Sequence, residues 1–90
     1  MMRAKIRIDT VSDVSNFVRE INSDGSINKY IVENEKGTHR VNARSYLGMI
    51  YASAEFGDGM YLVNETEDGH FPAFINKWRH TGEDGNFIHK

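Results

Sequence analysis

The chain has 90 residues with 13 acidic and 11 basic side chains, a formal net charge of −2, and no cysteine. This length suits one domain, and the charge balance is unlike the basic stripe typical of nucleic-acid-binding proteins. The lack of cysteine excludes disulfides and thiolate metal sites. No apolar run approaches the roughly 20 residues of a membrane span, and no signal peptide is recognisable, so we expect a cytoplasmic protein that binds neither membrane nor nucleic acid.

The first half of the chain predicts a strand, a helix and a hairpin. Alternating apolar residues over 4–8 indicate a half-buried strand. One apolar helical stripe follows, made of Val14, Phe17, Val18 and Ile21. Thr10 is the expected N-cap, because Asp13 follows three residues later, and Ser12 is a rival. Residues 27–33 and 38–42, joined by 34–37, predict a β-hairpin.

The second half predicts two further helices and one more strand. Ser45 precedes a short helix over 46–54, and residues 60–63 read as the last strand. A final helical stripe consists of Phe71, Phe74, Ile75 and Trp78, with Pro72 in the first turn and Gly82 as the stop. We therefore expect one domain over 1–79 and a flexible tail over 80–90.

The resulting order is β-α-β-β-α-β-α. Three amphipathic helices need an apolar surface to cover, and four short strands provide one. The predicted fold class is α+β, with a four-stranded antiparallel sheet and three helices on one face, as in an open-faced β-sandwich.

The segment 41–50, which reads VNARSYLGMI, resembles the region around the regulatory serine of HPr, the phosphocarrier of the bacterial sugar phosphotransferase system. In that family a strand ends, a basic residue precedes a serine, and the serine begins a short helix that contains a glycine. The order of elements is also that of HPr, and the similarity covers residues 4–79. The resemblance implies an HPr-like fold and a role in regulating sugar uptake.

The chain departs from this family at the phosphocarrier site. HPr proteins carry their phosphorylated histidine at the start of the first helix, followed by arginine and proline. Here no histidine precedes His39, and the only proline is Pro72. Asp13 suits capping far better than acyl-phosphate chemistry. We therefore expect no phosphocarrier activity.

Ser45 has two compatible readings. Its hydroxyl can cap the following helix, and the resemblance adds phosphorylation by an HPr-type serine kinase, with Arg44 helping to neutralise the phosphate. On the same helix Met49 and Ala52 are expected to face the sheet. Some of Tyr46, Leu47 and Ile50 should remain exposed, either as a docking surface for a protein partner or covered by a loop or a second copy.

No feature of the sequence supports an enzyme, a cofactor or a metal. The histidines, at positions 39, 70, 80 and 89, match no metal-ligand spacing. We expect a regulatory, protein-binding HPr-like module whose partner is a kinase or a regulator. The alternative is a homodimerising scaffold in which Ser45 is only a helix cap.

Overall fold

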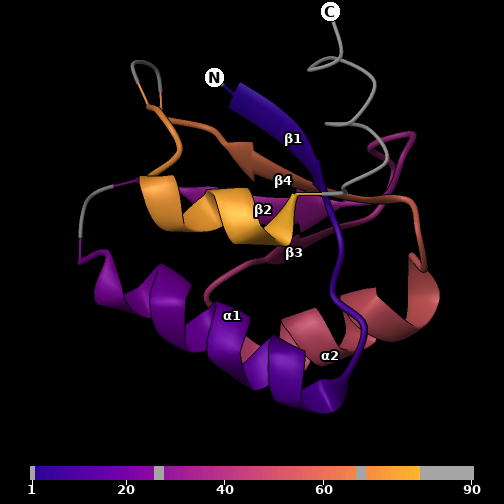
Figure 1. Cartoon of the computed structure of the whole chain (residues 1–90). Helices are drawn as coiled ribbons and strands as arrows, with labels where there is room; N and C mark the ends of the chain where they lie inside the picture. Colours follow the sequence, from indigo (N-terminus) through magenta and orange to yellow (C-terminus); the bar gives the residue numbers. More distant parts are fainter. Residues whose placement is uncertain (1, 26–27, 67–68, 80–90) are drawn as a thin grey trace, which may run out of the picture.

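The computed structural model describes residues 2–25, 28–66 and 69–79. It contains four strands, two α-helices and one 3-10 helix (Figure 1), namely β1 (Met2–Ile6), α1 (Val11–Ser23), β2 (Tyr30–Glu33), β3 (Arg40–Asn42), α2 (Tyr46–Glu55), β4 (Met60–Asn64) and η1 (Ala73–Trp78). The α+β class and the order of the elements are confirmed.

The strands form one antiparallel sheet in the order β1-β4-β2-β3. Leu62 in β4 lies opposite Ala4 of β1 and Val32 of β2. Because side chains alternate along a strand, these residues face the same side. All three are buried, and Val32 and Leu62 belong to the core that also contains helix residues. The helices lie on that one side of the sheet (Figure 1), and within residues 2–25, 28–66 and 69–79 no helix covers the opposite, open side.

The apolar stripe of α1 points into the core as predicted. Val14, Phe17 and Ile21 are fully buried, and Val18 nearly so. Thr10 is the N-cap, since its Oγ1 accepts a hydrogen bond from the Asp13 amide at 3.0 Å. Ser12 lies inside the first turn, so the prediction of Ser12 as a rival cap is wrong.

The hairpin strands are shorter than predicted. β2 begins at Tyr30, and β3 begins at Arg40 rather than at Thr38. β3 begins late because the Asn34 Oδ1 accepts hydrogen bonds from the amides of Thr38 (2.8 Å) and His39 (3.2 Å). Gly37 has φ +73°. These residues therefore form a side-chain-stabilised turn instead of strand.

The last helix is a short 3-10 helix, and the prediction that it runs on to Gly82 is wrong. Pro72 lies just before it, and Arg79 is already extended. The Arg7 amide donates to the Trp78 carbonyl at 2.8 Å, and Arg79 forms a β-bridge with Ile6. The residues at and just after the end of β1 therefore bond to the backbone groups of Trp78 and Arg79 that a longer helix would use. The predicted tail, 80–90, lies outside the described residues.

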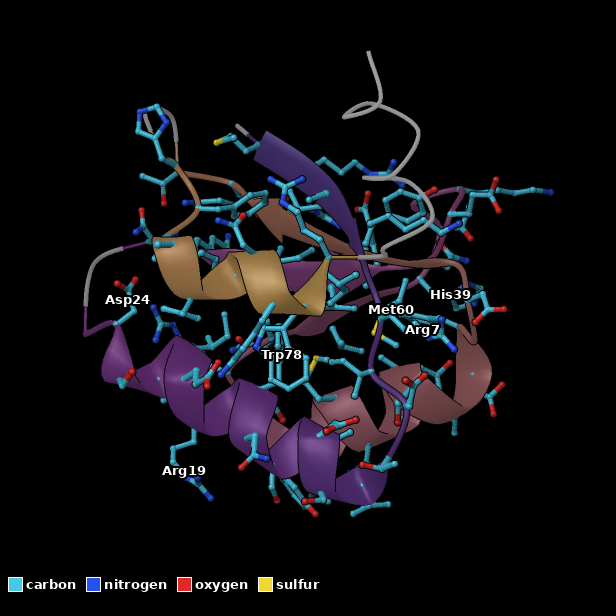
Figure 2. The ribbon with its side chains drawn as sticks, viewed as in Figure 1. Arg7, Arg19, Asp24, His39, Met60 and Trp78 are labelled. Carbon is cyan, nitrogen blue, oxygen red and sulfur yellow. The ribbon has the colours of Figure 1, made fainter. Side chains whose placement is uncertain are left out.

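The core joins the sheet to all three helices. Trp78 of η1 (Figure 2) packs edge-to-face against Phe17 of α1, and their ring centroids are 5.4 Å apart. Its indole Nε1 donates to Glu20 Oε1 at 2.9 Å, so the polar edge of the ring is satisfied. The same core includes Met49 and Ala52 of α2, which are both fully buried as predicted.

Candidate functional site

Ser45 is the N-cap of α2, as its position in the sequence predicts. Its backbone is extended, with φ −94° and ψ 118°. Its Oγ accepts a hydrogen bond from the Gly48 amide at 3.1 Å, and its carbonyl accepts from Met49 at 2.9 Å. The hydroxyl therefore lies at the positive end of the helix macrodipole, among amides that have no partner inside the helix.

The turn between β3 and α2 holds Ser45 in this place. Asn42 ends β3, its Oδ1 accepts from the Arg44 amide at 2.9 Å, and its carbonyl accepts from the Ser45 amide at 3.0 Å. Ala43 within the turn is fully buried. The chain thus passes from strand to helix in a tight turn that Asn42 stabilises from both its side chain and its backbone.

Gly48 allows the first turn of α2 to close on this cap. A Cβ at Gly48 would lie 3.3 Å from both Cβ and Oγ of Ser45, and 3.4 Å from the Cβ of Val41 in β3. Such contacts are tighter than most real side chains make. The missing side chain therefore leaves the space beside the Ser45 hydroxyl open.

The Arg44 guanidinium hydrogen-bonds to groups other than Ser45. Its guanidinium donates to the carbonyls of Ile21 at 2.9 Å and Asn28 at 3.1 Å, and lies 5.3 Å from the ring centre of Tyr30. Asn22 in turn donates to the Arg44 carbonyl at 3.2 Å. Arg44 ties the C-terminal end of α1 to the segment before β2, and it would have to give up these bonds to pair with a phosphate.

The three apolar candidates on α2 differ in exposure. Leu47 is 78% exposed and Tyr46 is 42% exposed, whereas Ile50 is half-buried and packs against the core. Tyr51, which the sequence reasoning missed, is 46% exposed. Its position four residues after Leu47, on the same side of a helix, is the signal that could have revealed it. The exposed apolar surface of α2 therefore consists chiefly of Tyr46, Leu47 and Tyr51.

The N-terminal end of α1 carries no phosphoryl acceptor of the histidine type. Residues 9–13 place Thr10 at the cap, and Arg7 forms an ion pair with Asp9 at 2.9 Å. His39 lies in the β2–β3 turn beside Asn34 and Thr38, while His80 and His89 lie outside the described residues. Within residues 2–25, 28–66 and 69–79, no group of histidine and acidic side chains could hold a metal ion.

Ion pairs cross the open side of the sheet. Glu33 of β2 pairs with Arg3 of β1 at 2.7 Å and with Arg40 of β3 at 3.1 Å. Arg40 also pairs with Glu65, and the Arg3 guanidinium lies 3.8 Å above the Tyr61 ring. Arg3 and Arg40 are therefore engaged with the protein's own carboxylates and with the Tyr61 ring, which favours a structural role for these two cations.

None of the helices among the described residues is long and apolar enough to cross a membrane. No protein-family model, curated protein or solved structure matches this chain.

Proposed function

We propose that the chain is a regulatory, protein-binding module of the HPr type that lacks the phosphocarrier histidine and is controlled by phosphorylation of Ser45. A partner would dock on the exposed part of α2. The order of elements and the serine that begins α2 support this proposal, because both are features of the resemblance.

The observation that carries the proposal is the position of the Ser45 hydroxyl. It is the N-cap of α2 and is followed directly by exposed Tyr46 and Leu47. A phosphate there adds close to two negative charges and three acceptor oxygens, which helix N-terminal amides favour. The same charge lies at the edge of the apolar surface, where it would change the affinity of whatever protein covers Leu47.

Photo-crosslinking tests the docking surface. A benzoylphenylalanine at position 47 should form a covalent adduct with another protein in cells, and Ser45→Asp should change the yield of that adduct. The matched control places the same residue at Ala73, which is exposed on η1. Equal crosslinking from both positions would show that the exposed part of α2 is not a docking surface.

The alternative is a homodimer in which Ser45 is only a cap. Its specific support is that the Ser45 Oγ is already engaged with the Gly48 amide, while Leu47 stays exposed. Sedimentation velocity separates the two readings. A dimer abolished by Leu47→Ser favours the scaffold, whereas a monomer at all concentrations favours a different partner.

A further inference from the structure

A hollow of about 460 Å³ lies between the β2–β3 turn and the C-terminal half of α2. Asn34, Glu35 and His39 line it from the turn, and Tyr51, Glu55 and Phe56 line it from the end of α2. Figure 2 shows His39 at this end of the molecule, beside α2. The hollow therefore lies at the other end of α2 from Ser45.

Its walls combine aromatic rings with carboxylate side chains. Tyr51 and Phe56 pack edge-to-face, with ring centroids 5.9 Å apart. Among the described residues, the carboxylates of Glu35 and Glu55 take part in no ion pair, in contrast to those of Glu20, Glu33 and Glu65. Lys36 is the one lysine or arginine among the lining residues, against the two carboxylates of Glu35 and Glu55. The hollow is therefore suited to a cation in contact with aromatic rings.

The hollow is continuous with the apolar surface of α2. Leu47, Tyr51 and Glu55 follow one another at intervals of four residues, so they form one row along the helix. The row begins with a strongly exposed leucine, passes through a tyrosine that also lines the hollow, and ends on a carboxylate. A partner that covers Leu47 would therefore reach the hollow one to two helical turns further on.

We propose that the hollow receives a lysine or arginine side chain of the protein partner, whose neighbouring apolar residues cover Leu47 and Tyr51. This rests on the proposed docking function and specifies the partner's chemistry as a basic, amphipathic segment. Charge complementarity supports it, because unpaired carboxylates accept charge-assisted hydrogen bonds and aromatic faces attract cations. An apolar centre with a polar rim is also the usual anatomy of a protein interface.

Selection from a random-peptide library displayed on phage tests the proposal. The full chain is the bait, and each enriched peptide is then synthesised and its affinity measured. We expect enriched peptides to combine a lysine or arginine with apolar residues. Leu47→Ser should abolish their binding, while Glu35→Gln and Glu55→Gln should each weaken it about threefold. Asp58→Asn, which removes a carboxylate from the adjacent turn outside the lining, should leave binding unchanged.

The outcomes separate this inference from the function on which it rests. Peptides that need Leu47 but bind equally well to Glu35→Gln and Glu55→Gln would overturn the cation hollow and leave the docking surface intact. Acidic peptides, or peptides that Asp58→Asn weakens as much as Glu55→Gln, would overturn it as well. A selection that yields no peptide dependent on Leu47 would contradict both. Circular dichroism of each variant verifies that the fold is retained.

Discussion

The side chain of Ser45 serves as a hydrogen-bond acceptor for the first turn of α2, independently of any phosphorylation. Its Oγ accepts the Gly48 amide, and alanine cannot replace that acceptor. Ser45→Ala should therefore lower the free energy of unfolding by about 1 kcal/mol, the usual worth of an N-cap. Ser45→Asp should stay close to wild type, because its carboxylate is also a good cap. Urea denaturation of the three proteins measures this, and equal stability of Ser45→Ala and wild type would contradict the capping role.

We expect Arg44 to stabilise the folded state through its own hydrogen bonds, and not only to neutralise a phosphate on Ser45. Arg44→Met keeps the length of the side chain but removes the bonds to the Ile21 and Asn28 carbonyls. The loss should be about 2 kcal/mol, since hydrogen bonds from charged donors are the stronger kind. Arg19→Met is the matched control, because the exposed Arg19 hydrogen-bonds, within the described part of the chain, to the Asn16 side chain one turn away and points away from the core (Figure 2). Similar thermal midpoints for the two variants would refute this assignment.

At the scale of elements, the N-cap of α1 is assigned to Thr10 rather than to Ser12, and two alanine variants test this assignment. Thr10→Ala should cost about 1 kcal/mol of unfolding free energy, because the Asp13 amide then loses its acceptor. Ser12→Ala, in the first turn of the same helix, should be neutral or slightly stabilising, since alanine has the higher helix propensity. Denaturation of the two variants under identical conditions decides the point. The reverse order of stabilities would place the cap at Ser12.

What could be predicted from the sequence at this scale was local. The stripe through Phe17 and the cap at Ser45 depend on neighbours within about one turn, so spacing reveals them. The type and end of η1 depend on Arg7 and Ile6, which lie about 70 residues earlier in the chain. The start of β3 depends on which amides the Asn34 side chain accepts. Contacts of this kind leave no periodic trace in the sequence.

The same limit applied to the site. The position of Ser45, and the expectation that some of Tyr46, Leu47 and Ile50 remain exposed, followed from the helix pattern, but which of the three are exposed did not. The hydrogen-bond partners of the Arg44 guanidinium could not be predicted from the sequence, because the carbonyl of Ile21 comes close to it only through tertiary packing. The hollow beside Tyr51 was equally hidden, since its two walls come from different elements.

At the scale of the whole molecule, ion pairs between elements make stability sensitive to acid. The hydrogen bond from Arg40, together with the nearby charges of Arg40 and Lys29, lowers the pKa of Glu65 despite partial desolvation. For Glu20, burial raises the pKa, but the bonds from Lys77 and Trp78 outweigh it and the net pKa is lowered. A carboxyl group whose pKa is lower in the folded state stabilises the fold at pH values above its ordinary pKa of 4.5. That contribution is lost as the pH falls through the folded-state pKa.

Glu65→Gln should therefore flatten the loss of stability between pH 5 and pH 3, an acid range set by carboxyl groups whose ordinary pKa is about 4. At neutral pH the variant should be destabilised by less than about 1 kcal/mol, as expected of a partly exposed pair. Glu55→Gln is the control, because Glu55 makes no ion pair among the described residues. Urea midpoints across this range provide the measurement. Parallel pH profiles for wild type and Glu65→Gln would show that the pair between Arg40 and Glu65 contributes nothing.

Intact-mass spectrometry tests the central claim, regulatory phosphorylation without phosphocarrier chemistry, most directly. The chain is incubated separately with ATP and an HPr serine kinase, and with phosphoenolpyruvate and enzyme I of the phosphotransferase system. We expect a gain of one phosphate with the kinase alone, and no gain in Ser45→Ala. A gain with phosphoenolpyruvate would contradict the claim, because another residue would then be replacing the missing histidine. No gain from the kinase would contradict the regulatory role of Ser45 and leave the helix cap as its function.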